Sequence, residues 1–558
     1  MALSTAIAAA AAVGGAFAAW HYHRLGLTLT HYDARGHLVV ARRIIDSITP
    51  GWQQIGAVWL PLPHLLNVLP VQIDRLYRTG ASAVAISIAS YAIATGTIAW
   101  IVNAVCEGRD ERARGGPASA PLLPPVAAAA VFALNPNVVY LQSTPLTEPL
   151  LLATITVAIA TLMAWCGGGS THDSAATAVA RATTRIPQPP GSERDARVRA
   201  AHVGVAFALA CLTRYEAWSV TAAALAAAAL TRWRRGDDVR AVWRSIGSIA
   251  LYPAAAIAGF ALFSRVVVGQ WFVGTDFFVP ENKALGDWWL AAKEIGWGIE
   301  QLSGAALTWI GGAGLAVALV RSAEAFARRR RSHVLSPGVF DLHPNALVAM
   351  SLLAMAVVPL GAFYEGHPFR VRYMAPLIAV EAIGVGIVAG ALPARRARTV
   401  GAAALLAVAA YELRPLDASS PLVAEAKWDV PNLAARARVT ACIGRLEPGA
   451  KIMASMGSLG HYMQETSRAG FAVRDFLHEG NGDIWLAALE QPLPFANWIL
   501  IEEKAQGGDM LAKIARERPG FLTGYQRVCD GAGVALYRRL AEGSTKGNTV
   551  TDFEHGKN

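Results

Sequence analysis

The sequence carries little charge for its length. Only 16% of its 558 residues are Asp, Glu, Lys or Arg, whereas about 25% is usual in soluble proteins. Hydrophobic residues make up 54% of the chain, and the mean hydropathy is +0.35. Several apolar runs approach the roughly 20 residues that a membrane-spanning helix needs. This composition excludes an ordinary cytosolic enzyme and a disordered chain.

Cysteine is also scarce, and nucleotide-binding glycine motifs are missing. The five cysteines contain no CxxC pair, which argues against a zinc or redox module. The chain has neither a Walker loop nor a GxGxxG run. Cys442 and Cys529 fall in the more polar C-terminal part, where an extracytoplasmic location would permit a disulfide. Two buried free thiols are an equally good interpretation of that pair.

Eleven apolar segments predict a polytopic α-helical membrane protein. They lie at residues 2–20, 81–105, 118–134, 146–166, 200–212, 217–230, 246–268, 301–320, 345–362, 373–392 and 399–411. The short segments 200–212 and 217–230 could form a re-entrant hairpin instead of two crossings. Segment 2–20 is similar to a signal peptide, but it lacks a basic n-region, so we expect a retained first helix.

Charge in the connecting loops predicts the orientation of these helices. The net charge of +10 would suggest a nucleic-acid partner in a soluble protein, but here the arginines cluster between apolar runs. Five loops hold 21 Lys and Arg residues, and the four that alternate with them hold five. The positive-inside rule then places the N-terminus in the cytoplasm and segment 21–80 outside. We expect a multi-pass protein of the inner membrane that binds no nucleic acid.

The C-terminal part changes character at about residue 412. Short strand-like runs such as 452–454, 498–501 and 534–537 alternate with helix-like stretches such as Asp509–Arg518. This pattern is typical of a small α/β domain. The sequence therefore predicts a transmembrane domain over 1–411 and an extracytoplasmic (periplasmic) α/β domain over 412–558.

The first exterior segment carries polar residues at helical spacing. Asp33, His37, Val40 and Ile44 form one stripe of a predicted helix, with Asp33 and His37 one turn apart. A carboxylate near the membrane surface usually marks a functional site. The helix dipole alone also favours an Asp at a helix start.

This segment resembles the GT-C superfamily of membrane glycosyltransferases, which use polyprenyl-phosphate-linked sugars. The pattern is most similar to protein O-mannosyltransferases and lipid A aminoarabinose transferases. Asp33, His37 and Arg42 match the family's acidic residue and its followers, although Ala34 stands where many relatives carry a second acid. The Pro-Leu-Pro-His run that ends at His64 resembles a proline-rich segment later in the same loop.

Further exterior positions fit the resemblance, each beside a structural alternative. Glu148 matches an acidic position of the family, but Thr144 and Pro145 before it would make a good helix start. Arg214 could bind phosphate, although Thr213 and Glu216 have the spacing of a capping box.

An exterior Arg-Tyr pair in the family is thought to meet the lipid phosphate. Arg370, Arg372 and Tyr373 match that position, and arginine forks suit phosphate oxygens. Snorkelling of these arginines to lipid headgroups is the structural alternative.

The resemblance implies a sugar donor on a polyprenyl phosphate and a protein, lipid or glycan acceptor. We expect Asp33 to accept the proton of the acceptor hydroxyl as it attacks the anomeric carbon, with inversion. Arg370, Arg372 and Arg214 would hold the departing phosphate. His37, Arg42, His64, Glu148 and Tyr373 complete the expected substrate site.

Other interpretations of the sequence stay open. Asp33, His37, His64 and Glu148 could bind a divalent metal, although their spacing matches no metal signature and we expect no cofactor. A lipid or sugar transporter or flippase would need polar residues within its spans. A non-catalytic subunit of cell-envelope glycan assembly is the third possibility.

Overall fold

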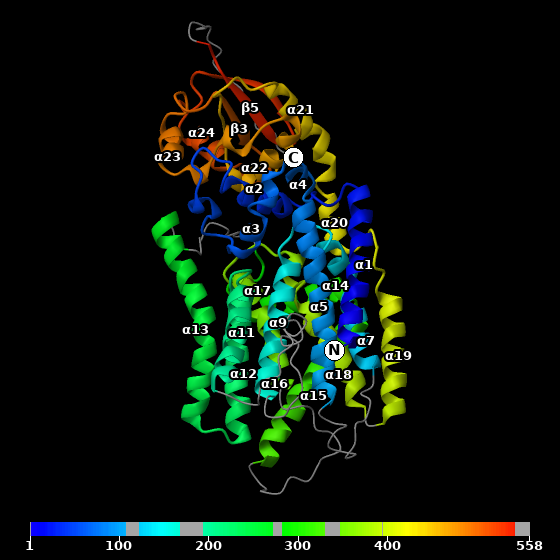
Figure 1. Cartoon of the computed structure of the whole chain (residues 1–558). Coiled ribbons are helices and arrows are strands. Elements are labelled where there is room, and N and C mark those ends of the chain that lie inside the picture. The colour runs from blue at the N-terminus through cyan, green and yellow to red at the C-terminus, as the bar shows by residue number, and fades with distance from the viewer. Residues whose placement is uncertain are drawn as a thin grey trace. The chain divides into compact units, whose positions relative to one another are not determined.

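The computed structural model describes residues 2–107, 122–167, 193–269, 271, 282–329, 346–392 and 394–541. The chain divides into two compact units (Figure 1). The first contains Met1–Ile44 and Trp52–Val430, and the second contains Ile45–Gly51 and Pro431–Asn558. The division follows α20 (Pro421–Lys427) because that helix packs on the first unit, where Leu422 N donates to Asn137 Oδ1. The boundary predicted near 411 lies before α20.

The described part of the first unit is helical. Its remaining elements are α1 (Ala2–Arg24), α2 (Tyr32–Arg43), η1 (Trp52–Ile55), α3 (Leu62–Asn67), η2 (Pro70–Gln72), α4 (Asp74–Thr79), α5 (Ala81–Glu107), α7 (Leu123–Ala133), α8 (Pro136–Leu141), α9 (Glu148–Gly167), α11 (Glu193–Cys211), α12 (Glu216–Arg235), α13 (Val239–Phe263), η3 (Ser264–Val268), α14 (Trp288–Ser303), α15 (Ala305–Arg329), α16 (Ala346–Met350), η4 (Ser351–Ala356), α17 (Val357–Tyr364), η5 (Val371–Met374), α18 (Leu377–Ala391) and α19 (Arg395–Glu412).

These helices confirm the predicted polytopic fold class. Six helical stretches of the described chain are long and apolar enough to cross a membrane: 2–24, 81–106, 148–167, 239–268, 305–324 and 346–364. Shorter apolar helices cover 123–133, 198–211 and 377–391. Each of the eleven predicted segments coincides with at least one of the helices, but the count of eleven crossings stays a prediction.

Two details of the predicted topology have a structural counterpart. Helix α1 packs into the unit through buried Ala11 and Tyr22. Helices α11 and α12 run for 19 and 20 residues, or about 30 Å each at 1.5 Å per residue. That length favours two complete helices over a short re-entrant hairpin.

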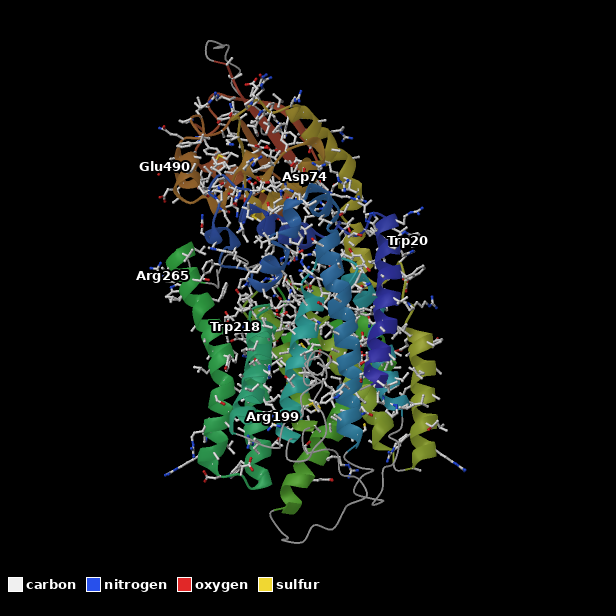
Figure 2. All side chains as sticks on the ribbon, viewed as in Figure 1. Trp20, Asp74, Arg199, Trp218, Arg265 and Glu490 are labelled. Atoms are coloured by element: carbon white, nitrogen blue, oxygen red, sulfur yellow. A yellow bond between two sulfur atoms is a disulfide. The ribbon has the colours of Figure 1, made fainter. Side chains whose placement is uncertain are left out.

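The helices pack through small residues and expose large apolar ones. A Cβ on Gly314 of α15 would lie 2.0 Å from the carbonyl oxygen of Gly384 on α18, so only glycine permits this approach. Trp20, by contrast, is 55% exposed and points away from the bundle (Figure 2). The arginine-rich junction of α12 with α13 lies at the end of the first unit opposite α2 (Figure 1), in keeping with the charge alternation in the sequence.

The second unit is built on a five-stranded sheet, as an α/β pattern predicts. Its strands are β1 (Ile452–Ala454), β2 (Phe476–Leu477), β3 (Trp498–Glu502), β4 (Tyr525–Gly531) and β5 (Val534–Arg539). The order is β2-β1-β3-β5-β4, in which β2, β1 and β3 are parallel and β5 is antiparallel to β3 and β4.

Helices and one disulfide complete the second unit. Its helical elements are η6 (Val430–Asn432), which begins one residue before the division, α21 (Leu433–Ile443), α22 (Met456–Glu465), η7 (Thr466–Ala469), η8 (Val473–Asp475), η9 (Glu479–Asn481), α23 (Asp483–Glu490), η10 (Ala505–Gly507) and α24 (Met510–Glu517). Cys442 and Cys529 form the disulfide that joins α21 to β4. Of the two interpretations that the sequence left open for this pair, the disulfide is therefore the one observed.

The segment Ile45–Gly51 belongs to the second unit although it follows α2 directly. Asp46 accepts hydrogen bonds from the backbone amides of Val473 and Arg474 at 3.2 and 3.4 Å. Asn481 Nδ2 donates to Ser47 Oγ at 3.2 Å and to Thr49 Oγ1 at 3.1 Å. The second unit is therefore built from two separate stretches of the chain.

Candidate active site

Helix α2 begins with a histidine cap that positions Asp33. His31 is the N-cap residue, and its Nδ1 accepts a hydrogen bond from Asp33 N at 3.2 Å. Asp33 then stands in the first turn, where the helix dipole favours a negative charge. Its side chain is 26% exposed. The predicted helix is present, with Asp33 partly buried in its first turn.

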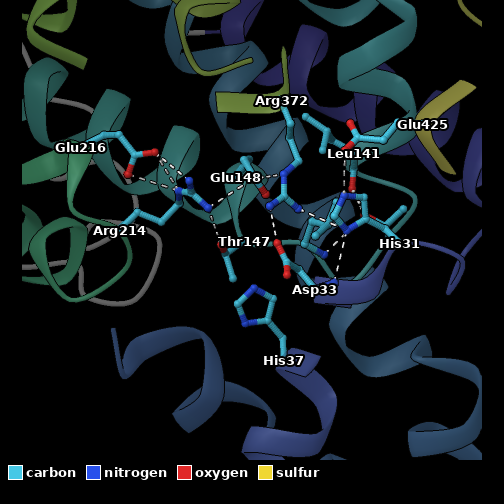
Figure 3. A network of polar contacts seen from close by, with 12 residues as sticks. His31, Asp33, His37, Leu141, Thr147, Glu148, Arg214, Glu216, Arg372 and Glu425 are labelled. Atoms are coloured by element: carbon cyan, nitrogen blue, oxygen red, sulfur yellow. Dashed lines mark hydrogen bonds and ion pairs between the residues drawn. The ribbon is translucent and has the colours of Figure 1, made fainter. Parts of the chain in front are cut away.

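Arg372 brings three parts of the chain together around Asp33 (Figure 3). It lies on η5, before α18, and its side chain is only 7% exposed. Its Nη2 donates to Asp33 Oδ2, and its Nη1 lies 3.4 Å from His31 Nδ1. Its Nε lies 3.4 Å from Glu148 Oε1.

Glu148 is the buried centre of the network. Its Oε1 also lies 3.2 Å from Arg214 Nη1, so one carboxylate oxygen faces two guanidinium groups. Its Oε2 is buried and has no hydrogen-bond partner within the described ranges. The helix start predicted at Thr144 and Pro145 is wrong, because α9 begins at Glu148 itself and Thr144 Oγ1 donates to Leu141 O.

Arg214 extends the network to the start of α12. It contacts Glu216 Oε1 at 2.7 Å and donates to Thr147 Oγ1 at 3.1 Å. The predicted capping box is wrong: the N-cap residue is Tyr215 without a side-chain cap bond, and Glu216 pairs with Arg214 instead. Glu216 is therefore a member of the site that the sequence pattern assigned to a cap.

The other side of the network contains His31 and Glu425, which the sequence did not single out, together with the predicted Arg370. His31 Nε2 and Arg370 Nη1 each lie 3.7 Å from Glu425 Oε1. Glu425 stands on α20, whose short sequence carries no motif, so only the fold could reveal its place. These contacts join four carboxylates and three guanidinium groups in one continuous cluster.

Electrostatics hold Asp33 in its ionised form. Burial alone would raise the pKa of the Asp33 carboxyl, but the Arg372 guanidinium and the rings of His31 and His37 together hold that pKa below its ordinary value. A carboxylate with a lowered pKa is a weak proton acceptor. The network also leaves Arg372 paired with acids, so an anionic ligand would have to exchange with them.

Two further predicted residues form a pair beside Asp33. His37 Nδ1 lies 3.1 Å from His64 Nε2, and His64 Nδ1 lies 3.1 Å from the carbonyl oxygen of Leu60. Trp59 lies against His37 with ring centroids 4.2 Å apart. Burial lowers the pKa of the His37 imidazole to about 3, with Arg372 and Arg214 adding to the effect and Asp33 opposing it.

Arg42 and Tyr373 differ in their relation to the site. Arg42 is committed elsewhere: it contacts Asp74 at 2.7 Å, donates to Val71 O and lies over the Tyr77 ring. These contacts lie outside the network around Asp33, so the role of Arg42 in substrate binding stays a prediction. Tyr373 lies beside Arg372, whose guanidinium carbon is 5.9 Å from the tyrosine ring centre.

The residues proposed as metal ligands do not gather into a metal site. Within the described ranges, no group of three or more His, Cys, Asp or Glu side chains could hold an ion. Asp33 and Glu148 are each paired with arginine, and His64 is hydrogen-bonded to His37 and a carbonyl. The donor set therefore does not fit a divalent cation as it stands.

The first unit has a polytopic helical membrane fold, and the second unit is an α/β fold. The solved structure of ArnT from Cupriavidus metallidurans bound to undecaprenyl phosphate has this fold, with a TM-score of 0.50 at 11% identity over 91% of this chain and 94% of that one. An oligosaccharyltransferase from Archaeoglobus fulgidus, in complex with Zn and sulfate, matches at a TM-score of 0.44 and 13% identity, over 84% of this chain and 62% of that one. No family model and no curated protein matches the sequence.

Proposed function

We propose that this protein is a membrane glycosyltransferase that moves a sugar from a polyprenyl phosphate to an acceptor hydroxyl. The observation that carries the proposal is the convergence of Asp33, Glu148 and Arg372 from three distant parts of the chain. Buried charges are costly unless they serve each other or a ligand. A site that contains both carboxylates and guanidinium groups suits a reaction in which a phosphate leaves.

Arginine supplies the phosphate-binding chemistry in this proposal. The guanidinium groups of Arg372 and Arg214 share the Glu148 carboxylate, and Arg370 is 43% exposed beside Glu425. A phosphate oxygen can replace a carboxylate oxygen in an arginine fork without losing the charge-assisted bond. Exchange at Glu148 would free that carboxylate to face the sugar, while Asp33 keeps its hydrogen bond from Arg372.

The buried oxygen of Glu148 supports a polar ligand in the same place. A carboxylate oxygen without a donor is costly to bury, and a sugar hydroxyl would satisfy it. Asp33 is the proposed catalytic carboxylate, since its side chain is the most exposed of the four acids and it lies one helical turn from His37. Direct attack by the acceptor would invert the anomeric centre.

The donor class is proposed from the fold of the ArnT structure, which holds undecaprenyl phosphate. We further propose that the site faces the extracytoplasmic side of the inner membrane, as the loop charges predict, with the N-terminus in the cytoplasm and the second unit in the periplasm. Nucleotide sugars are not supplied there, which explains the need for a lipid-linked donor. Protein, lipid and glycan acceptors all remain within the proposal.

The test uses the purified full chain in lipid nanodiscs. Synthetic undecaprenyl-phosphate monosaccharides are supplied as a panel, and mass spectrometry follows new glycosides and released undecaprenyl phosphate. We expect the wild type to transfer sugar from at least one donor. Asp33→Asn should lower the transfer rate at least 100-fold while still binding undecaprenyl phosphate. Sugar movement across sealed vesicles without a new bond would instead indicate a transporter.

A further inference from the structure

The proton released by the acceptor needs a base, and Asp33 is poorly suited to that role. Its carboxylate receives a hydrogen bond from Arg372 and its pKa is held below the ordinary value. Efficient proton transfer favours a base whose pKa lies near the working pH. The histidine beside Asp33 offers a second acceptor.

The Leu60 carbonyl, acting through His64, determines which ring nitrogen of His37 carries no proton. A carbonyl oxygen can only accept, so the 3.1 Å contact to Leu60 O places the proton of His64 on Nδ1. Burial lowers the pKa of His64 well below its ordinary value, so the ring is neutral and its Nε2 is an acceptor. The 3.1 Å contact with His37 then requires the proton of His37 to be on Nδ1. The Nε2 of a neutral His37 is left with its lone pair.

The surrounding residues hold this pair in place. His64 is 1% exposed, and the Trp59 ring covers His37. A Cβ on Gly36 would meet Trp59 Cη2 at 2.7 Å, so the glycine of α2 is what allows the indole to lie there. Figure 3 shows the His37 ring on the same side of the network as the Asp33 carboxylate and Thr147.

From this geometry we propose that His37 is the proton acceptor of the transfer and that His64 is a positioning residue that sets its tautomer. The inference rests on the proposed function. The acceptor O–H proton moves to His37 Nε2 as the acceptor oxygen bonds to the anomeric carbon. The bond from that carbon to the phosphate oxygen breaks, and its electron pair leaves with the polyprenyl phosphate. The imidazolium then returns its proton to the leaving phosphate.

In this proposal, donor binding raises the pKa of His37. The charged and titratable groups that face His37 are Asp33, Arg372, Arg214, His31 and His64. Arg372, Arg214 and His31 lower its pKa and Asp33 raises it, with burial the largest cause. An anionic phosphate beside the two arginines offsets their effect, so the pKa of His37 rises towards the working pH only when donor is bound. Asp33 supplies the counter-charge of the imidazolium.

The first test reads the tautomer directly and needs no turnover. The full chain is labelled with ¹⁵N-histidine in nanodiscs, and the His37 signals are identified by their loss in His37→Gln. We expect a single form with hydrogen on Nδ1, mixed forms in His64→Phe and the wild-type form in His64→Gln, whose amide oxygen can accept. Hydrogen on Nε2 in the wild type, or an unchanged signal in His64→Phe, would overturn the proposal.

The second test adds undecaprenyl phosphate as the probe. We expect the apparent pKa of His37 to rise by at least one unit when the lipid is bound. Binding that leaves this pKa unchanged contradicts the role of His37. A wild type that binds no undecaprenyl phosphate contradicts the proposed function instead, and the tautomer result then stands on its own.

The third test measures transfer with the donor panel. We expect His37→Gln to lower kcat by about 10²–10⁴-fold with donor binding retained, which is the usual contribution of a general base. His64→Phe should lower kcat about tenfold without raising KM, and His64→Gln should stay within threefold of the wild type. Wild-type kcat in His37→Gln would remove the residue from the reaction.

Discussion

The Arg372 guanidinium donates a hydrogen bond to the Asp33 carboxylate, although the two residues are 339 positions apart in the chain. One residue belongs to the first turn of α2 and the other to the short η5 turn before α18. The pair is therefore a contact between distant segments that the fold must create. Substituting either Arg372 or Asp33 should therefore have a measurable effect.

Removing Arg372 should weaken phosphate binding. A hydrogen bond to a charged group contributes about 1.5–3 kcal/mol, so Arg372→Ala should raise the Kd for undecaprenyl phosphate by about 10–100-fold. Arg372→Lys keeps the charge but loses the fork, and we expect an intermediate value. Arg75→Ala, at an exposed position of α4, is the control. Equal Kd values for Arg372→Ala and this control would refute the phosphate role.

The sequence predicted the helical class, the α/β unit and most residues of the ion-pair cluster around Asp33 and Glu148. The sequence signals were local: either helical spacing or a charged residue in a loop where the charge rule predicts few. They marked Asp33, His37, Glu148, Arg214 and Arg372. Such signals arise within a few residues, so a single segment can display them.

The remainder of the site depends on the tertiary fold. Glu425 reaches the cluster from a short helix without a motif, and Glu216 has the spacing of a cap that does not form. Arg42 has the spacing that the resemblance expects, and in the structure its side chain pairs with Asp74. Pairing partners are chosen by packing between helices, which a pattern along one segment does not record.

The Asp33–Arg372 pair should make the first unit sensitive to acid. The folded-state pKa of Asp33 lies below its unfolded value of about 4. The group therefore contributes stability that is fully present above that value and is lost as the pH falls towards the folded pKa. We expect the Tm of the detergent-solubilised protein to fall between pH 5 and pH 3, and to fall less in Asp33→Asn. Parallel curves for the two proteins would contradict the assignment.

The disulfide of the second unit gives a prediction about thiol counts and stability. Maleimide should label three cysteines of the unfolded, unreduced chain, namely Cys106, Cys166 and Cys211, and all five after reduction. Cys442 and Cys529 are 87 positions apart. Cross-linking a loop of that size stabilises a fold by roughly 2–4 kcal/mol. Cys529→Ser should lower the denaturation midpoint of the second unit accordingly, and five labelled cysteines before reduction would show that no bond exists.

The strap Ile45–Gly51 should control local order in the second unit. Asp46 is 8% exposed and accepts from two backbone amides, so Asp46→Ala leaves the amides of Val473 and Arg474 without their acceptor. An unsatisfied buried donor costs about 1–3 kcal/mol. We expect hydrogen exchange of residues 473–477 in the full chain to accelerate by about 10–100-fold. Glu490→Gln, at an exposed position on α23, serves as the control. If exchange in 473–477 matches that control, the strap is a passive connection rather than a structural part of the second unit.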